Sequence, residues 1–251
     1  MILYFSGTGN SKFIAELFCK YIDAKCYSIE ETADFSNLIS YEDCIGFCYP
    51  IYASRVPRIM REFVLNHIEH LENKKIIIFC TQVLFSGDGA RAFMDIFSNV
   101  SIDVIYAEHF FMPTNVCNLS IWPIPNESKI KNYIVKAEKK MKKVCHNIKN
   151  DITVKRGFNI ISRILGLSQG LFFPAIEKYA LNRVMINDNC IKCKLCSSIC
   201  PMNNLEFQGE KIVHKSNCTI CYRCINKCPQ KAINVFFLWK INKQYKGSEN
   251  Y

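Results

Sequence analysis

Residues 1–11 read MILYFSGTGNS and join a strand pattern directly to a loop rich in glycine and hydroxyl groups. The first five residues form a continuous apolar run, which is typical of a strand buried on both faces. Apolar residues recur at helical spacing over residues 13–21, so a helix is expected after the loop. A strand, such a loop and a helix N-terminus can hold a phosphate group through backbone N–H groups and hydroxyls. Two common phosphate motifs are excluded, because Lys12 lacks the preceding glycine and following Ser or Thr of a Walker loop and stands where a Rossmann loop needs its third glycine.

The candidate phosphate-binding residues are those of the loop itself: Ser6, Gly7, Thr8, Gly9, Asn10 and Ser11. The alternative is a glycine turn that joins a strand to a helix and binds no ligand.

Strand patterns and helix patterns alternate along the first 150 residues. Strand-like runs cover residues 26–29, 44–49, 75–80 and 104–111, and helical spacing covers residues 56–71, 90–97 and 130–148. This alternation predicts an α/β fold with a doubly wound parallel sheet. Such sheets bind ligands beyond the carboxyl ends of their strands, where the strand order reverses. The loops at residues 50–54 and 81–89 meet that requirement together with residues 6–11.

The loop at residues 6–11 resembles the S/T-x-T-G-x-T phosphate loop of the flavodoxin family, with Ser11 in place of the last Thr. The resemblance implies the strand order 2-1-3-4-5 and bound flavin mononucleotide (FMN). In that family the two later loops hold the flavin ring, which implies cofactor-binding roles for Pro50, Tyr52, Thr81, Gly87 and Gly89. Tyr52 is the candidate for stacking on the ring and Tyr49 is the alternative, while Tyr52 is otherwise an ordinary loop tyrosine. Residues 112–115, MPTN, are similar to a tetrapeptide of flavodoxin domains that are fused to ferredoxins.

Two copies of the pattern C-x2-C-x2-C-x3-C-P occupy residues 190–229. The cysteines are Cys190, Cys193, Cys196 and Cys200 in the first copy and Cys218, Cys221, Cys224 and Cys228 in the second. Thiolates at this density suit iron–sulfur clusters. A zinc ribbon would leave four of the eight idle, and a disulfide framework suits a much shorter secreted chain than 251 residues.

The cysteine stretch closely resembles bacterial two-cluster ferredoxins, in which the fourth ligand of each cluster comes from the other copy. The resemblance implies an α+β ferredoxin domain with two [4Fe-4S] clusters. Cluster one would use Cys190, Cys193, Cys196 and Cys228, and cluster two would use Cys218, Cys221, Cys224 and Cys200.

Charge divides the chain into an acidic front and a basic back. Residues 1–126 carry a net charge of −5, residues 127–186 one of +9 and residues 187–236 one of +4. The two domains should therefore attract each other, and an external redox partner is expected to present an acidic docking surface. Lysines around residues 126–148 form either a solvated helix face or such a docking surface. Nucleic acid is not expected, because the aromatic residues are not interleaved with the lysines.

The seven remaining cysteines are scattered without ligand spacing: Cys19, Cys26, Cys44, Cys48, Cys80, Cys117 and Cys145. Free thiols of this kind, and no apolar leader after Met1, favour a reducing cytoplasm.

Residues 157–184 are apolar at helical spacing, but charged residues break any run long enough to span a bilayer. We expect a connector folded between two domains, and a helix lying in a membrane interface is the alternative. The tail from Lys240 is polar and basic and is expected to fray.

The whole chain resembles bacterial flavodoxin–ferredoxin fusions of the EFR1-type ferredoxin family. The expected organisation is a flavodoxin-like FMN domain at residues 1–150, a helical connector at 151–186, a two-cluster ferredoxin domain at 187–236 and a basic tail at 237–251. The resemblance implies anaerobic electron transfer between the clusters and the flavin, as an adapter between one-electron and two-electron partners. A flavin-dependent reductase of a small acceptor and a ferredoxin with a flavin-free docking domain are the alternatives. Whether the chain is itself an enzyme is left open.

Overall fold

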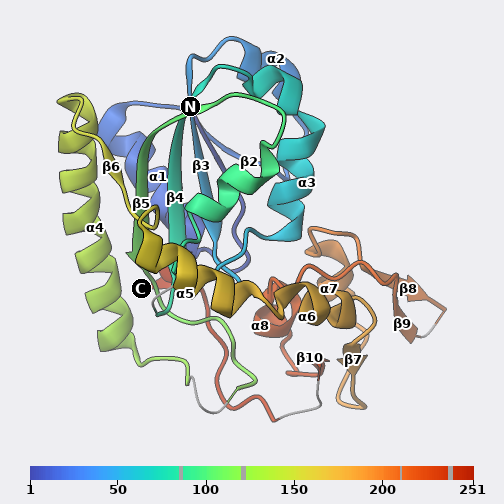
Figure 1. The fold of residues 1–251 in the computed structure, drawn as a ribbon. Helices are drawn as coiled ribbons and strands as arrows, with labels where there is room; N and C mark the ends of the chain where they lie inside the picture. Colours follow the sequence, from blue (N-terminus) through green and yellow to red (C-terminus); the bar gives the residue numbers. More distant parts are fainter. Residues whose placement is uncertain (85–86, 120–122, 210, 237–239) are drawn as a thin grey trace.

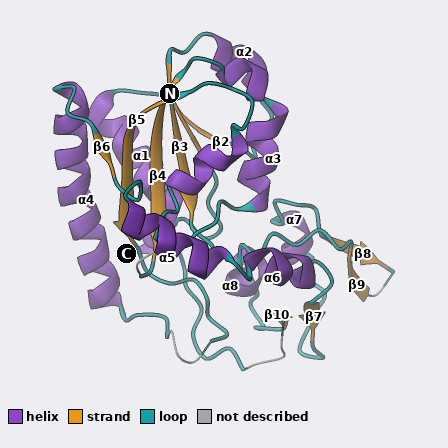
Figure 2. Cartoon of the chain, in the orientation of Figure 1, coloured by secondary structure: helices purple, strands orange, loops and turns teal. Residues whose placement is uncertain are grey.

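The structure is a computed structural model that describes residues 1–84, 87–119, 123–209, 211–236 and 240–251. It contains a large unit, built on a six-stranded parallel sheet, and a smaller unit of short helices and two-stranded sheets (Figures 1 and 2). The helices α5 (Ile160–Gly170) and α6 (Phe173–Ala180) run between them across one side of the molecule (Figure 1).

The large sheet has the order β2-β1-β3-β4-β5-β6 and is parallel throughout. Its strands are β1 (Ile2–Tyr4), β2 (Cys26–Ser28), β3 (Cys44–Pro50), β4 (Lys75–Gln82), β5 (Asp103–Phe111) and β6 (Val154–Lys155). The predicted flavodoxin-like order 2-1-3-4-5 is confirmed. The sixth strand comes from residues that the sequence assigned to the connector.

Helices cover both faces of this sheet. On one face, α1 (Asn10–Ile22) and α4 (Glu127–Lys149) pack in a common apolar cluster. On the other lie α2 (Phe35–Ser40), α3 (Arg58–Asn66), and the 3-10 helices η1 (Ile68–Leu71) and η2 (Arg91–Ile96). The helix expected over residues 56–71 is therefore two shorter helices. It begins only after Pro57, whose ring fixes φ just before the first turn.

The small unit follows α5 (Ile160–Gly170) and α6 (Phe173–Ala180). Its elements are β7 (Val184–Ile186), α7 (Leu195–Ser198), β8 (Leu205–Gln208), β9 (Lys211–His214), α8 (Arg223–Lys227) and β10 (Ile233–Val235). Because β7 pairs with β10, the α+β sheet of this unit begins at Val184, just before the expected boundary at residue 187.

The end of the chain is packed, so the expectation of a frayed tail is wrong for residues 240–251. Ile241 and Tyr245 are buried, and the 3-10 helix η3 (Ser248–Asn250) lies beside α1. Residues 237–239 of the predicted tail lie outside the described residues. None of the helices in the described part of the chain has both the length and the apolar character needed to cross a lipid bilayer.

Candidate flavin and iron–sulfur sites

The loop at residues 6–11 lies between the end of β1 and the N-terminus of α1. Gly9 takes a left-handed conformation with φ of 99°, which glycine adopts without strain. Its N–H donates a hydrogen bond to Ser6 Oγ at 3.0 Å. Ser11 Oγ lies 2.8 Å from Thr81 Oγ1 and joins this loop to the end of β4. The loop thus presents the N-terminus of a 13-residue helix, the element that stabilises phosphate.

Three loops at the carboxyl edge of the sheet enclose a cavity of about 590 Å³. This volume lies within the ordinary range of cofactor pockets. Eight of the predicted cofactor residues line it: Ser6, Gly7, Thr8, Asn10, Ser11, Pro50, Tyr52 and Thr81. Gly9 instead lines a smaller adjoining cavity on the outer side of the loop.

Gly87 and Gly89 lie apart from the described lining of the cavity. Gly87 packs against Gly166 of α5, and Gly89 packs against the side chain of Ile51. In both places an added Cβ would overlap a neighbour, so close packing accounts for these two glycines. Their assignment to the flavin ring stays a prediction. Ser86, beside them, lies outside the described residues.

The two candidate stacking tyrosines differ in position. Tyr49 is fully buried, donates to the carbonyl of Gly89 at 3.1 Å and stacks on Phe93 in the core. Tyr52 lines the cavity, and burial raises the pKa of its hydroxyl well above the usual value. Of the two tyrosines, only Tyr52 is therefore placed to touch a ligand in the cavity.

Two buried polar atoms of the cavity residues have no hydrogen-bond partner in the described chain. They are the Tyr52 hydroxyl and Gln82 Oε1. Both atoms are closed off from water, so a ligand in the cavity would reach them only if their side chains turned. The lining itself combines hydroxyl and amide groups, such as those of Ser6, Thr8 and Asn10, with apolar side chains such as Ile51 and Phe173. It therefore fits a cofactor that carries both an apolar ring and polar edges.

The sequence did not predict that three other segments would complete the cavity. The connector contributes Gln169, Phe173 and Ile176, and the second cysteine motif contributes Ile220 and Tyr222. Asn115 and its neighbours form a further wall, whereas the sequence showed only a turn at residues 112–115. None of the described lining residues carries a carboxylate, imidazole, amine, guanidinium or thiol.

The C-terminal tail covers the outer side of the loop at residues 6–11. The hydroxyl of Tyr245 donates to Asn10 Oδ1 at 2.6 Å, and Ser248 Oγ donates to the carbonyl of Gly9 at 3.2 Å. Asn10 Nδ2 donates to the carbonyl of Pro113 at 2.8 Å. Asn10 is thereby fixed between the tail and a wall of the cavity.

The eight motif cysteines gather around two small cavities. Cys190, Cys193, Cys196 and Cys228 line one, and Cys200, Cys218, Cys221 and Cys224 line the other. These are the two groups that the crossed ferredoxin pattern implies. Among the described residues, no group of three or more His, Cys, Asp or Glu side chains is arranged to hold a single metal ion.

The two cysteine motifs repeat one backbone conformation. Positive φ angles occur two and four residues after the first cysteine of each copy, and three residues after the fourth: Lys192, Lys194 and Asn203 in the first copy and Ile220, Tyr222 and Lys231 in the second. The repeated left-handed residues turn each loop around its cavity. Backbone N–H groups of Asn204, Ile220 and Ala232 donate to cysteine sulfurs at 3.2 to 3.4 Å, as the thiolates of a cluster require.

Burial raises the pKa of Cys196 to about 11 and that of Cys221 to about 12. Without a bound metal, these two thiols hold their protons at neutral pH. A bound iron would have to displace those protons to gain thiolate ligands, which couples loading to pH.

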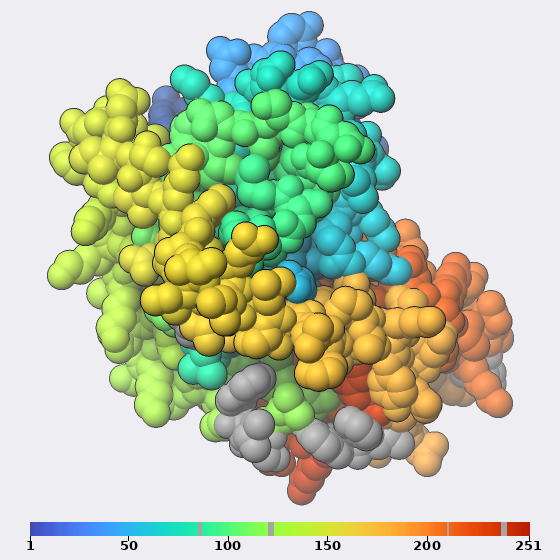
Figure 3. Space-filling model, viewed as in Figure 1, coloured from blue at the N-terminus to red at the C-terminus, as the bar shows by residue number. Residues whose placement is uncertain are grey.

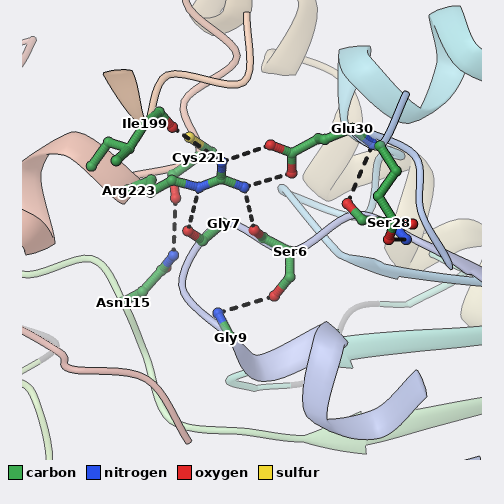
Figure 4. A network of polar contacts seen from close by, with 10 residues as sticks. Ser6, Gly7, Gly9, Ser28, Glu30, Asn115, Ile199, Cys221 and Arg223 are labelled. Atoms are coloured by element: carbon green, nitrogen blue, oxygen red, sulfur yellow. Dashed lines mark hydrogen bonds and ion pairs between the residues drawn. The ribbon is translucent and has the colours of Figure 1, made fainter. Parts of the chain in front are cut away.

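The second cysteine motif touches the loop at residues 6–11 directly. A Cβ on Gly7 would overlap the carbonyl oxygen of Cys221, so only glycine allows this approach. The same carbonyl accepts a hydrogen bond from Asn115 Nδ2 at 3.2 Å (Figure 4). The cavity therefore shares a wall with the group Cys200, Cys218, Cys221 and Cys224, which we call the inner cysteine group.

Arg223 stabilises the contact between the second cysteine motif and the loop at residues 6–11 (Figure 4). Its guanidinium donates to the carbonyls of Ser6 at 2.8 Å, Gly7 at 3.1 Å and Ile199 at 3.1 Å. It also forms a bidentate ion pair with Glu30, with both distances 2.6 Å. A basic residue of the small unit thus meets an acidic residue of the large unit.

Comparisons with known proteins agree with both units. A family model described as a flavodoxin domain matches residues 1–115, and one described as a 4Fe-4S dicluster domain matches residues 189–232. No curated protein sequence matches the chain.

Three solved structures are similar to part of this chain. A flavodoxin from the domain Archaea is 13% identical over 59% of this chain and 96% of that chain, with a TM-score of 0.37. Oxidised flavodoxin 2 from Bacillus cereus is 18% identical over 55% and 97%, with a TM-score of 0.36. General stress protein 14 from Treponema denticola, in complex with FMN, is 11% identical over 59% and 97%, with a TM-score of 0.38.

The fold and the two family matches define a protein of flavin and iron–sulfur electron transfer. The chain is a fusion of a flavodoxin domain with a 4Fe-4S dicluster domain.

Proposed function

We propose that this protein exchanges electrons internally between FMN in the cavity and two [4Fe-4S] clusters held by the crossed cysteine groups. The observation that carries the proposal is the contact between Gly7 and the carbonyl of Cys221. It places a residue of the phosphate loop against a residue of the inner cysteine group. Bound flavin accepts one or two electrons and each cluster one, so the pair suits an adapter between one-electron and two-electron partners.

The residues of the cavity have separate tasks in this proposal. The loop at residues 6–11 and the α1 N-terminus would hold the phosphate. Tyr52 and Phe173, whose ring centroids lie 6.4 Å apart, form an apolar wall suited to the flavin ring. Ser54 donates to Gln169 at 2.6 Å and fixes the connector against this wall.

The lining favours an adapter over a reductase of a small acceptor. A reductase needs a group that delivers or removes a proton near the reacting atoms. The ionisable side chains among the described lining residues are those of Tyr52 and Tyr222, and burial raises the pKa of both. A flavin-free docking domain is disfavoured by the size of the cavity and by its mixed polar and apolar lining.

The other group, Cys190, Cys193, Cys196 and Cys228, is the outer cysteine group and includes the exposed Cys193. We propose that external redox partners dock beside it. Lys192 and Lys194 flank this cysteine and suit an acidic redox protein. None of the fifteen cysteines forms a disulfide, which suits the proposal of a reducing cytoplasm.

The first test is composition after purification without oxygen. We expect about eight iron atoms and one FMN per chain. Iron without flavin would remove the adapter proposal and leave a ferredoxin with a docking domain.

The second test is the rate at which the flavin absorbance follows one-electron reduction of the clusters. We expect a first-order rate that does not change with protein concentration. Gly7→Ala should slow it, because the new methyl group separates the two loops. Val135→Ala, at a 61% exposed position on α4, serves as the control. A rate proportional to protein concentration would show that the exchange occurs between molecules.

A further inference from the structure

The connector helix α5 packs on the protein through its smallest side chains. Its buried residues are Ser162, Gly166 and Gly170, which recur every four positions along one face. A Cβ on Gly166 would overlap the Asp88 carboxylate, and one on Gly170 would overlap the Arg55 guanidinium. The helix backbone therefore lies close against the large unit, and only small residues fit between them.

This arrangement turns the large apolar side chains of the connector outward. A soluble surface helix normally buries such residues and exposes polar ones. Here Ile161 is 67% exposed and Phe172 is 69% exposed. We name the exposed group the α5–α6 apolar face, and it comprises Ile160, Ile161, Ile164, Leu167, Leu171, Phe172 and Ile176. Figure 3 shows this segment, in gold, lying across the front of the molecule.

The charges beside the α5–α6 apolar face have one sign. Residues 155–183 include a single acidic residue, Glu177, which is held in an ion pair with Arg61 of α3 at 2.5 Å. The exposed charged residues of this segment are all basic: Lys155, Arg163, Lys178 and Arg183, together with Arg156, which pairs with Glu108 at 2.6 Å. An exposed apolar face with basic flanks is the pattern of a helix that lies in the plane of an anionic membrane surface.

We propose that the α5–α6 apolar face binds the surface of an anionic lipid membrane. The apolar side chains enter the boundary between headgroups and acyl chains, and the basic residues contact the headgroups. A second copy of the chain fits the face less well, because two-fold symmetry brings Arg163 and its neighbours against like charges. Phe173 and Ile176 of α6 also line the cavity, so a bound protein has this wall of the cavity at the lipid surface.

The test is sedimentation of the full holoprotein with lipid vesicles. Vesicles of phosphatidylcholine alone are compared with vesicles that also contain phosphatidylglycerol. We expect at least about tenfold tighter binding to the anionic vesicles, and weaker binding as salt is added. Absence of binding to anionic vesicles, or equal binding to both kinds, overturns the proposal.

The variant is Ile161→Asp combined with Ile164→Asp, which places two carboxylates in the apolar face. The matched control is Val135→Asp on α4, where the native side chain is similarly exposed. Far-ultraviolet circular dichroism confirms that each variant is folded. We expect the double variant to bind anionic vesicles at least about tenfold more weakly and the control to bind as the native protein does. If the double variant binds anionic vesicles as tightly as the native protein does, the proposal is overturned. It is also overturned if the native protein does not bind vesicles and instead forms a concentration-dependent dimer that the double variant abolishes.

Discussion

Replacing Arg223 by methionine should loosen the contact between the two units. The guanidinium makes five hydrogen bonds of 2.6 to 3.1 Å, to three backbone carbonyls and to both oxygens of Glu30. Methionine keeps most of the side-chain volume and removes all five. The side chains of Arg223 and Glu30 are only 18% and 22% exposed, so little water replaces the lost partner.

The expected cost follows from this partial burial. Removing one partner of a buried, hydrogen-bonded ion pair costs about 3 to 5 kcal/mol, and we take the lower end because some water reaches the pair. About 3 kcal/mol corresponds to roughly a hundredfold rise in the opening equilibrium of the contact. Arg223→Lys keeps the positive charge but loses the planar guanidinium that binds both oxygens of Glu30. Its opening equilibrium should therefore lie between those of the native protein and Arg223→Met.

Amide hydrogen exchange on the oxygen-free holoprotein measures this opening locally. We expect faster exchange in residues 6–9 and 221–224, with α4 unchanged as the internal reference. Arg163→Met, at an exposed position on α5, is the matched control. A change of less than about threefold for Arg223→Met would refute the reasoning, since that is below the smallest contribution expected of a single charged hydrogen bond.

Three further predictions concern single side chains. Cys228→Ser should abolish the spectrum of the cluster held by the first motif and spare the other, and electron paramagnetic resonance that shows only the second-motif cluster affected would contradict the crossed assignment. Tyr245→Phe removes the hydrogen bond to Asn10, which is worth about 1 kcal/mol, so fluorescence titration should show roughly fivefold weaker FMN binding. An unchanged affinity would show that this contact of the tail does not support the flavin site. Burial lowers the pKa of His109 to about 4, whereas an unfolded histidine titrates near about 6.5. The unfolded state therefore binds more protons between these values, so stability should fall by about 1.4 kcal/mol for each pH unit below about 6.5, and His109→Gln should flatten this dependence in hydrogen exchange of β5; an unchanged slope in that variant would show that another group is responsible.

The sheet and both cofactor motifs were predictable because their signals are local. Buried parallel strands need continuous apolar runs, and residues 75–80 and 104–111 show them plainly. The loop at residues 6–11 and the cysteine motifs each lie within a short stretch, where the spacing of a few residues carries the signal of the two domains that the family models match.

The contacts that surround and close the cavity were not predictable, because they join segments that are distant in the sequence. Tyr245 is set among polar and basic residues that resemble a free tail, and its partner Asn10 is 235 positions away. Gly87 suggested a ligand turn, and its packing against Gly166 of α5 left no signal in the sequence. The apolar pattern of residues 157–184 predicted helices but not which face would be buried, since small residues form the packed side.

The shared wall at Gly7 and Cys221 has a thermodynamic consequence for assembly. The segment at residues 218–224 both lines the cavity, through Ile220 and Tyr222, and contributes three cysteines to the inner cysteine group. With FMN and the clusters bound as proposed, ordering of this segment on iron loading would alter the affinity for flavin, and linkage would then require flavin to alter the affinity for iron by the same factor. The two proposed cofactors would in that case be ligands of a single coupled site, and neither affinity would be a fixed property of its own domain.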